Sequence, residues 1–452
     1  MVSKGIKKIA VCLVMMISLS IASANVFAAE MKWSYDADTK TVSVSGYGLI
    51  NDATELSQYL DETEKIVVNP GVTSIDKNVF ANIGNVSEVS LPDGILSIGE
   101  SSFNLSRNLK KINFPDSLES IGKEAFMECT SLENPVIPKG VKSIGANAFA
   151  DCTSITAFDV SDENETFVSV DGVIFTKDKK ELVIYPAGKT DEEYTIPDGT
   201  EKISEKAFAY NSNIEKVIFP DSLTEIGEGA FYFCNGLNAV QASENSGIKT
   251  IGNYAFYGCV LRDVTIPYGT ESIGEGAFKN CDTLRYVDIP GTVSSIGDDA
   301  FSGAYSAFGI GGYGDAAAGH ADKNDISFTK TVRVKIDERE IAFDTPAVIK
   351  DGCTMVPMKK IFEELGAEVE WDDTTKTAKG EKSGTVCTFS IGDKTLYKNG
   401  EAIELTAPAI IENSRTLVHI RAIAEALGAD VGWDGDTGLV DIHSVTEQNA
   451  AE

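Results

Sequence analysis

Residues that could carry chemistry are few in this sequence, and their spacing builds no known site. Only three histidines occur, His320, His419 and His443. Counting alone leaves a Ser-His-Asp arrangement open, but the sequence has no G-x-S-x-G elbow. The eight cysteines contain no C-x-x-C pair of the kind that binds zinc. We therefore expect no catalytic residues, no metal site and no cofactor.

Two short motifs resemble ligand loops but stand in the wrong context. Residues 309–314 match G-x-G-x-x-G, but a dinucleotide site also needs a strand before the motif and a helix after it. The following segment, DAAAGHADKND, has the composition of a linker. Residues 434–436 read Asp-Gly-Asp, yet the further ligands of a calcium loop do not follow at the required spacing. We interpret the first motif as part of a linker and the second as a polar turn.

A repeated heptad dominates the chain and must position whatever surface it uses. The motif reads SIGKEAF, SIGANAF, EIGEGAF and SIGEGAF in four of its copies. Most successive copies lie about 23 residues apart, and an isoleucine always stands five residues before the phenylalanine. A fixed period of this length predicts a solenoid, because one coil cannot bury its own Ile and Phe but stacked coils can. The nine phenylalanines are Phe80, Phe103, Phe126, Phe149, Phe208, Phe231, Phe256, Phe278 and Phe301.

Each copy also contains a strand-like run that ends in proline, such as LKKINFP at 109–115. Its last places alternate inward and outward, as a half-buried strand requires, and proline closes the strand because it has no N–H to donate. One step of 59 residues holds one coil and an insertion near 161–199. The insertion reads as a β-hairpin projecting from the stack. Residues 33–48 predict a further hairpin that caps the first coil.

Five cysteines lie three residues after a repeat phenylalanine: Cys129, Cys152, Cys234, Cys259 and Cys281. One interpretation is a column of small buried thiols. The other is disulfides between adjacent coils, which the spacing of coils would permit, although Cys152 and Cys234 are separated by coils without cysteine. Cys353 and Cys387 could form a pair further along the chain, and the sequence does not decide between the two states.

The N-terminus and the charge indicate where the chain works. Lys4, Lys7 and Lys8 precede an apolar run over 9–21, which predicts a signal peptide cleaved after Ala28. Its removal changes the net charge from -30 to -33, since three lysines leave. Such acidity argues against nucleic acid as a partner, and no other long apolar run predicts a membrane span in the mature chain.

Beyond the repeats the composition changes. Residues 353–371 and 415–433 align with an offset of 62 residues, so that Trp371 matches Trp433 and Gly366 matches Gly428. Each unit reads as a strand, an amphipathic helix ending at Leu-Gly, and a strand ending at Trp-Asp. The glycine suits a left-handed helix C-cap, and the tryptophan is most simply a core residue.

Two resemblances follow from these motifs. The repeats, with their AFxxC and IPxxVxxIG patterns, resemble the BspA-type leucine-rich repeats of bacterial surface proteins. This resemblance implies a surface protein that binds host, matrix or neighbouring-cell partners, and it implies no enzyme. The paired units resemble the copper amine oxidase N-terminal-like domain. That second resemblance carries no copper chemistry, since the catalysis belongs to a different and larger domain with a histidine copper site.

The expected fold is a β-rich leucine-rich-repeat solenoid with coils of about 23 residues, plus a smaller α+β domain made of two similar units. We expect a secreted or cell-surface protein that recognises a protein, cell-wall or matrix ligand without catalysis. The alternative is a cell-wall-associated accessory or hydrolase-linked protein that binds the wall through its C-terminal domain. The expected segments are 1–28 (signal peptide), 29–71 (N-terminal cap), 72–303 (solenoid), 304–325 (linker), 326–444 (C-terminal domain) and 445–452 (tail).

The outward places of the strand runs supply the candidate partner-binding residues. Their neighbours on both sides point into the core, so these places form a column along the solenoid. Basic, aromatic and apolar residues gather there on an otherwise acidic chain, as they do at interfaces. The alternative is a merely solvated face. The candidates are Lys110, Asn113, Val136, Ile218, Arg262, Arg285 and Tyr286.

Overall fold

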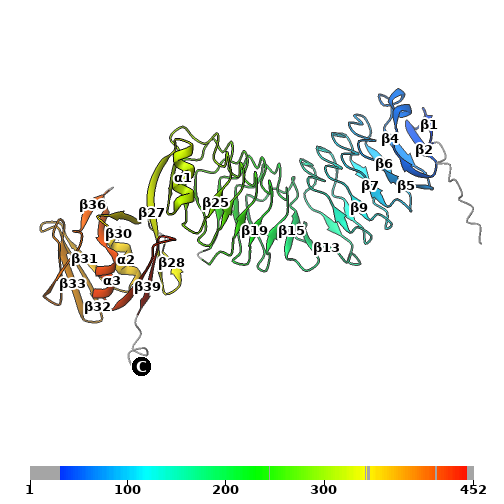
Figure 1. Cartoon of the computed structure of the whole chain (residues 1–452). Coiled ribbons are helices and arrows are strands. Elements are labelled where there is room, and N and C mark those ends of the chain that lie inside the picture. Colours follow the sequence, from blue (N-terminus) through cyan, green and yellow to red (C-terminus); the bar gives the residue numbers. More distant parts are fainter. Residues whose placement is uncertain (1–30, 244, 342, 344–346, 413–414, 445–452) are drawn as a thin grey trace, which may run out of the picture.

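The computed structural model describes residues 31–243, 245–341, 343, 347–412 and 415–444. The chain forms a long β-solenoid of about 12 turns, followed by a smaller β-rich domain with few helices (Figure 1). This is the fold class predicted from the repeats. The predicted signal peptide and tail lie outside the described residues. Within the described part of the chain, no helix is long and apolar enough to cross a membrane.

Every coil contributes two short strands, which stack in parallel on the strands of the next coil. The strands that precede the prolines form what we call the strand face. Near the N-terminal end of the solenoid, a 3-10 helix, η1 (Thr54–Gln58), follows the strand β3 (Gly48–Ile50). The strand face consists of β1 (Lys32–Asp36), β2 (Thr41–Ser45), β4 (Lys65–Val68), β6 (Glu88–Ser90) and β8 (Lys111–Ile112); β10 (Val136–Ile137) and β12 (Asp159–Val160); β16 (Glu193–Thr195), β18 (Lys216–Ile218) and β20 (Ala239–Gln241); and β22 (Asp263–Thr265), β24 (Tyr286–Ile289) and β26 (Gly309–Gly312).

The strands that carry the repeated isoleucine form two further sheets. The first sheet contains β3 (Gly48–Ile50), β5 (Val72–Ile75), β7 (Ser97–Ile98), β9 (Ser120–Ile121) and β11 (Ser143–Ile144). The second contains β13 (Phe167–Val170), β14 (Val173–Thr176), β15 (Glu181–Ile184), β17 (Lys202–Ile203), β19 (Glu225–Ile226), β21 (Thr250–Ile251), β23 (Ser272–Ile273) and β25 (Ser295–Ile296).

A ladder of phenylalanine rings fills the core between the strands. Phe126 is fully buried and stacks on Phe103 at 5.1 Å and on Phe149 at 5.2 Å between ring centroids. The same stacking recurs from Phe208 to Phe301. Offset stacks at this separation add about 1 kcal/mol per pair to the burial of the rings themselves. The ladder therefore explains why each copy ends in phenylalanine.

The turn that carries each ring has one conformation throughout the solenoid. Residues two before and two after the phenylalanine adopt positive φ, for example Glu124 (φ 56) and Glu128 (φ 59) around Phe126. As a result, the N–H groups at these three places all point at the next coil. The Phe126 N–H donates to the carbonyl of Ala148 at 2.8 Å, and the flanking residues donate in the same way. In most coils the turn is thus bonded to the next by three backbone hydrogen bonds.

The glycine after the repeated isoleucine is required by this close stacking. A Cβ placed on Gly122 would lie 2.6 Å from the backbone nitrogen of Glu100 in the preceding coil. Real Cβ atoms do not approach backbone so closely, so no larger residue fits there. The exceptions are Asp76 and Ser204, which begin coils whose preceding neighbour follows a different backbone path.

The five repeat cysteines are free and buried, in agreement with the interpretation as buried thiols. Each thiol donates to the carbonyl of a phenylalanine in an earlier coil; the Cys129 Sγ lies 3.1 Å from the Phe103 oxygen. Ser106 makes the equivalent bond to Phe80 with its hydroxyl. Burial raises the pKa of the Cys129 thiol to about 12. Cys353 and Cys387 are also free and buried.

The insertion near 161–199 is a hairpin, but it does not project from the stack. β14 and β15 pair antiparallel around the Lys-Asp-Lys-Lys turn, and β15 then pairs parallel with β17. The apolar side chains of these strands are buried on both sides: Ile174 joins the core of the first half, and Val173 joins that of the second. A hairpin with two apolar faces is more stable inside the stack than in solvent, so the sequence expectation was wrong on this point.

The segment 304–325 is a cap rather than a linker. Its glycines form β26, which pairs with β24, and its alanines form the helix α1 (Asp315–Lys323). Ala317 and Ala321 of this helix are buried on the last coils, and His320 stands edge-on to Phe301. Glycine and alanine are used here because small residues let a strand and a helix approach the final coil closely. The predicted hairpin at the opposite end is present as β1 and β2.

The C-terminal domain contains the two predicted strand-helix-strand units, and β30 and β37 pair antiparallel at their centre. Its elements are β27 (Ser327–Ile336), β28 (Arg339–Glu340), β29 (Ala347–Lys350), β30 (Cys353–Pro357), α2 (Met358–Glu364), β31 (Glu368–Asp372), β32 (Thr377–Lys382), β33 (Thr385–Ser390), β34 (Thr395–Lys398), β35 (Glu401–Glu404), β36 (Ile410–Glu412), β37 (Arg415–His419), α3 (Ile420–Ala426), β38 (Ala429–Asp434) and β39 (Leu439–Ser444). The tryptophans are not core residues: Trp371 is 39% and Trp433 41% exposed. Each stands at the outer end of its strand beside a turn, while residues of α2 and α3 fill the core.

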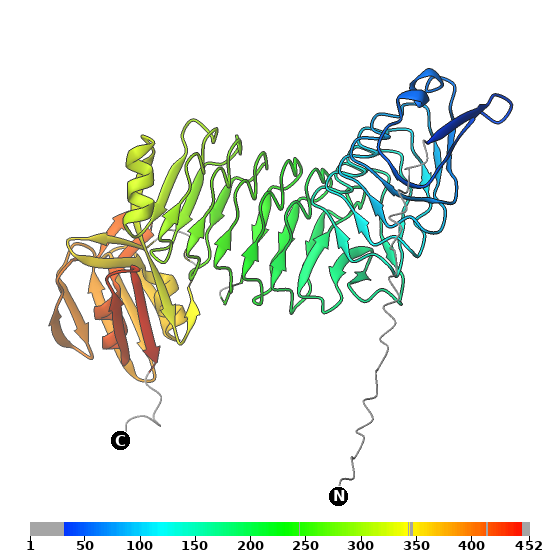
Figure 2. The same ribbon diagram turned by 45° about the vertical axis from the view of Figure 1, so that its right-hand side comes forward.

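The two parts of the molecule share one sheet. β27 pairs parallel with β26 of the cap at its start and with β39 of the C-terminal domain at its end (Figure 2). Arg333 of β27 is buried at this junction. Its guanidinium donates to the carbonyl of Ile266, to Asp288 at 3.3 Å and to Glu340 at 3.0 Å. The C-terminal domain is therefore joined to the solenoid by a continuous sheet and a buried ion pair.

We expect Phe126→Ala to lower the free energy of unfolding by roughly 3–5 kcal/mol, because a stacked ring is lost from a closed core. Urea unfolding followed by circular dichroism measures the loss. Tyr47→Ala is the control, since Tyr47 is 68% exposed. Equal losses for the two variants would contradict the ladder.

We expect Cys129→Ser to be tolerated better than Cys129→Val. Serine keeps the side-chain donor for the Phe103 carbonyl, as Ser106 does for Phe80, whereas valine leaves that carbonyl with only the Ser106 N–H at 3.2 Å. We expect the lost hydrogen bond to cost about 0.5–1.5 kcal/mol. The same unfolding measurement compares the two variants. A valine variant as stable as the serine variant would show that the thiol contributes only its volume.

We expect Arg333→Ala to cost roughly 3 kcal/mol, because it leaves Asp288 and Glu340 without their partner at a mostly buried junction. Urea unfolding gives the cost, and limited proteolysis reports whether β27 becomes accessible. The matched control is Arg262→Ala, whose side chain is exposed on the same face. An unchanged cleavage pattern and stability for Arg333→Ala would mean that the sheet alone holds the junction.

Candidate interaction surface

The sequence candidates lie on the strand face, as expected from their outward places. Lys110, Val136 and Arg262 are exposed, and Val136 shows 54% of its surface to solvent. Asn113 is also exposed, but its amide bridges both backbone groups of Leu91, at 2.8 and 2.7 Å. The stacking of coils thus explains why an asparagine stands at this position.

The strand face is not continuous along the solenoid. Its strands fall into four sheets, with breaks after β8, β12 and β20. Ile218 lies in the third of these sheets and is half-buried, in register with Thr195 and Gln241. The candidates are therefore distributed over four sheets.

The last two candidates are engaged by the chain itself. Tyr286 lies across Gly311 of β26, where its hydroxyl takes the space that a Cβ would need, and burial raises its pKa to about 12. The guanidinium of Arg285 lies over the ring of Tyr305 at 5.3 Å. The contact between Tyr286 and Gly311 shows that this glycine of the G-x-G-x-x-G motif serves packing. A helix does follow the motif, contrary to the expectation of a linker. Of the motif glycines, Gly309 and Gly311 lie in the paired strand β26, and Gly314 is the N-cap of the helix.

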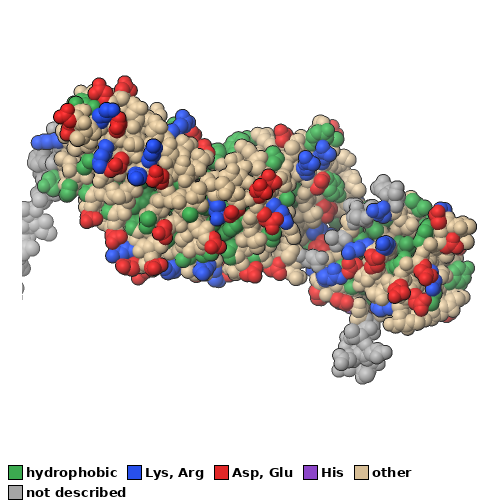
Figure 3. All heavy atoms as spheres, turned by 180° about the vertical axis from the view of Figure 1, so that it is seen from behind, with side chains coloured by type: hydrophobic (Ala, Val, Ile, Leu, Met, Phe, Trp, Pro, Cys, Tyr) green, Lys and Arg blue, Asp and Glu red, His purple; other side chains and the backbone are tan. Residues whose placement is uncertain are grey.

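Charges on the solenoid alternate in sign. Figure 3 shows acidic and basic side chains interspersed over the face that it presents. Many of them pair between neighbouring coils, such as Lys65 with Glu88 at 2.5 Å and Lys142 with Glu119 at 2.9 Å. Exposed pairs of this kind contribute little to stability, about 0–1 kcal/mol each. The face shown in Figure 3 therefore presents no single basic patch.

A cluster of half-buried aromatic side chains lies on the turns of three consecutive coils. We call it the aromatic platform; its members are Tyr210, Tyr232, Phe233, Tyr254 and Tyr257. Tyr232 and Tyr257 stack at 4.8 Å between centroids, and Phe233 stands edge-on to Tyr257 at 5.2 Å. The side chain of Asn280 donates to the Tyr257 hydroxyl at 2.7 Å. The rings are fixed by one another, which lowers the entropy that a partner must remove on binding.

Lys206 places a cation on this platform. Its ammonium lies 3.6 Å from the centroid of the Tyr232 ring. Burial lowers the pKa of Lys206, and its ammonium group faces the ring of Tyr232. Tyr210, on the same edge, has a raised pKa, first because of burial and then because of neighbours that include Asp151 of an earlier coil. The platform thus combines apolar area, hydroxyl groups and one cation.

The sequence analysis missed the platform, although a signal was present. Four of its rings stand one or two places after the repeat phenylalanine, in AYN, YFC and YGC, and Tyr254 stands two places before Phe256; most other coils have small, polar or charged residues at these places. The positions looked like variable turn residues, because only the stacking of adjacent turns brings them together.

The residues that could carry chemistry are scattered over the described part of the chain. No group of three or more His, Cys, Asp or Glu residues there could hold a metal ion. His320 and His419 have lowered pKa values because of burial, and they lie in different parts of the fold. The Asp434 carboxylate accepts from the backbone of Asp436 and Thr437, which confirms the polar turn.

Known proteins resemble both parts of the chain. The model of the BspA type leucine rich repeat region matches residues 57–176 and 191–307, together just over half of the 452 residues, and that of the copper amine oxidase N-terminal domain matches residues 335–442. A primary amine oxidase of Klebsiella aerogenes is 33% identical over 64 residues, which are 14% of this chain and 8% of that protein. The chain thus spans only a small part of that curated relative.

Two solved structures are similar to part of this chain. The Pneumococcal vaccine antigen PcpA is 26% identical, with a TM-score of 0.50 over 59% of this chain and 76% of that one. A leucine-rich repeat protein from Eubacterium ventriosum is 24% identical, with a TM-score of 0.45 over 62% of this chain and 94% of that one. The repeat match, the phenylalanine ladder and the fold agree, and the chain belongs to the BspA-type leucine-rich repeat family.

Proposed function

We propose that this protein is exported and acts at the cell surface or beyond it as a non-catalytic recognition protein, whose solenoid binds protein or matrix partners. The family supports a role in protein interaction or adhesion, and similarity to a vaccine antigen supports exposure outside the cell. The predicted signal peptide supports export. The C-terminal domain serves as a module that extends the solenoid through β27.

The aromatic platform is the observation that carries this proposal. Aromatic side chains, with arginine, dominate the binding energy of protein interfaces, and here five half-buried ones share one edge of the solenoid. The fold does not need them, since coils with Asn104, Ser302 or Asn82 at the corresponding places stack in the same way. A cluster that packing does not require is best explained by a partner.

The strand face supplies a weaker second surface. Lys110, Val136 and Arg262 are free to contact a partner, whereas Asn113, Arg285 and Tyr286 already contact their own chain. We therefore place recognition on the platform and keep the exposed strand-face residues as the comparison.

The test uses the chain from residue 29 to 452, immobilised against purified matrix proteins, whole bacterial cells and peptidoglycan. The platform variant carries Tyr232→Asn, Phe233→Asn and Tyr257→Ser, residues that other coils have at these places. We expect it to keep the unfolding midpoint and to lose about tenfold in affinity for the bound partner, or about 1.4 kcal/mol. The matched control carries Lys110→Ala, Val136→Ala and Arg262→Ala and should bind normally.

Other results would overturn the assignment. Loss of binding in the control alone would move recognition to the strand face. Release of soluble fragments from peptidoglycan by the intact chain would contradict the non-catalytic role and favour the wall-associated alternative. Binding to none of the three materials would contradict recognition as the function.

A further inference from the structure

The backbone ladder between the turns is interrupted at one place. In regular coils the N–H groups two before, at, and two after the phenylalanine donate to the next coil, as Glu124, Phe126 and Glu128 do. The next coil presents the same three groups on Asn147, Phe149 and Asp151. Within the described part of the chain none of these three N–H groups has an acceptor.

The coil on the other side of the interruption has carbonyls without donors. In regular coils the carbonyls three before and one after the phenylalanine accept from the preceding coil. The corresponding carbonyls around Phe208 are those of Glu205 and Ala209, and neither accepts a hydrogen bond from a described residue. Between them, the Ala207 carbonyl accepts from the Tyr185 N–H at 2.8 Å. The strand β11 also has no neighbour on its outer side, since β15 pairs with β14 and β17 instead.

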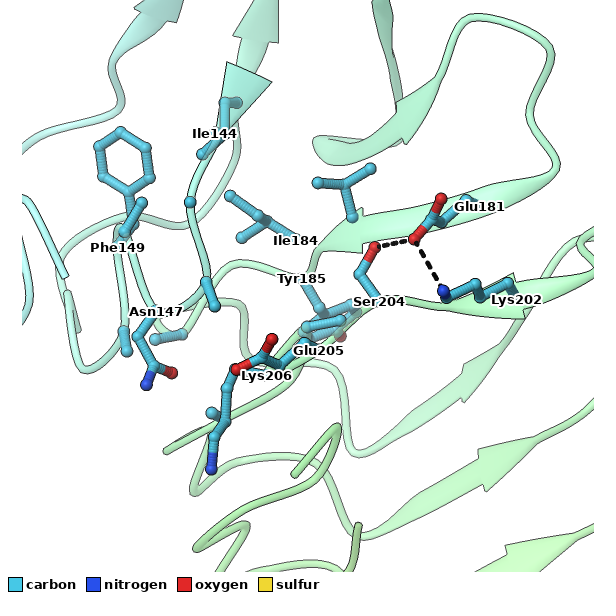
Figure 4. Close-up of a pocket in the computed structure, with 18 residues that line it drawn as sticks. Ile144, Asn147, Phe149, Glu181, Ile184, Tyr185, Lys202, Ser204, Glu205 and Lys206 are labelled. Atoms are coloured by element: carbon cyan, nitrogen blue, oxygen red, sulfur yellow. Dashed lines mark hydrogen bonds and ion pairs between the residues drawn. The ribbon is translucent and has the colours of Figure 1, made fainter. Parts of the chain in front are cut away.

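A cleft of about 280 Å³ separates these two walls. Figure 4 shows Ile144, Asn147 and Phe149 on one side and the β15–β17 region on the other. Alanines line both walls, and the Asn147 Oδ1 is shielded from solvent without a hydrogen-bond partner. These alanines are Ala146, Ala148, Ala150, Ala187, Ala207 and Ala209. Small side chains leave the backbone groups accessible to a ligand of similar size.

The sequence of the coil that follows the cleft is adapted to it. Ser204 replaces the glycine that regular coils need, and its hydroxyl donates to Glu181 at 2.7 Å, which in turn lies near Lys202 (Figure 4). Asn211 replaces the cysteine and reaches Pro186 at 3.0 Å. Glycine and cysteine, which regular coils have at these two places, would fit a complete neighbouring turn. The sequence therefore differs from the repeat where the stacking is interrupted.

We propose that this cleft binds a short peptide segment of a partner protein, which takes the place of the missing turn. Carbonyls of the segment accept from Asn147, Phe149 and Asp151, and its N–H groups donate to Glu205 and Ala209. The inference rests on the proposed function, because it gives the recognition solenoid a defined ligand class. Addition of a backbone segment to an open edge is a common mode of peptide recognition.

The chemistry of the walls favours a neutral backbone over other ligands. The charged side chains at the cleft balance one another, with Glu181 and Glu205 against Lys202 and Lys206. The unpaired N–H groups on one wall and the unpaired carbonyls on the other match six residues in the turn conformation of a coil, from three places before to two places after the ring position. Tyr185 stacks on Phe208 at 4.7 Å and already occupies the ring position, so the segment carries a small residue in place of phenylalanine.

The probe is a synthetic peptide with the sequence of residues 99–106 and Phe103→Ala. Hydrogen exchange of the full mature chain is measured with and without it. In the free chain, the amides of Asn147, Phe149 and Asp151 should exchange at least about tenfold faster than those of Glu124, Phe126 and Glu128, because only the latter are bonded. Saturating peptide should slow the first set and leave the second unchanged.

Two controls make the result specific. A peptide that is N-methylated at the residues corresponding to Ser101 and Leu105 lacks the donors for Glu205 and Ala209 and should bind at least about tenfold more weakly, a difference of about 1.4 kcal/mol. Ala146→Trp fills the cleft and should abolish protection. Glu100→Trp places the same ring at the corresponding exposed position of an earlier coil and should have no effect.

Several outcomes would overturn the inference. These are slow exchange at the three amides in the free monomer, equal binding of the methylated peptide, and equal protection in the Ala146→Trp and Glu100→Trp variants. Protection in the free chain that depends on protein concentration would assign the cleft to a second copy instead. Failure here leaves partner binding by the platform intact, whereas failure of the proposed function leaves peptide protection intact, so the two are separable.

Discussion

A single coil of this chain cannot bury its own isoleucine and phenylalanine, and the whole structure depends on that constraint. Within each half of the solenoid successive rings stack at about 5 Å, so every coil must present the same ring at the same height. The backbone obeys the same requirement. Three N–H groups per turn reach the next coil only if both turns have the same conformation. Packing and hydrogen bonding therefore select one repeated shape.

That shape accounts for residues whose roles are otherwise obscure. Glycine follows the isoleucine because the preceding backbone passes at van der Waals distance. Cysteine or serine stands three residues after the phenylalanine in most coils, where its side chain donates to the carbonyl of a phenylalanine in an earlier coil. Non-glycine residues accept positive φ at two places per coil, at a cost of about 1 kcal/mol each, because the next coil then satisfies three donors. Positions outside these requirements are free to vary, and the aromatic platform occupies such positions.

Each coil is stabilised by its neighbours, so the first and last coils need other elements to cover their cores. At the N-terminus, β1 and β2 form a hairpin that covers the first coil. At the C-terminus, β26, α1 and β27 cover the last ring and lead the sheet into the next domain. In the middle, the hairpin β14–β15 closes the two cores but leaves the turns unpaired, and this incomplete closure creates the cleft. The surfaces that we assign to partners thus lie where the repeat is varied or broken.

The amino-acid sequence by itself determined the solenoid, the register of its coils and the paired units of the C-terminal domain. Each of these follows from local rules: a period of about 23 residues, alternation along strands, and a glycine at the helix end. Other features were decided only by the tertiary structure. The glycines and alanines of 304–325 looked like a linker, the hairpin looked exposed, Trp371 looked buried, and Tyr232 and Tyr257 looked like unrelated turn residues. In each case the neighbour that decides the environment lies in another coil or another domain, and composition does not encode which surfaces meet. A repeat can be recognised in the sequence alone, whereas burial and clustering depend on contacts between residues that are far apart in the sequence.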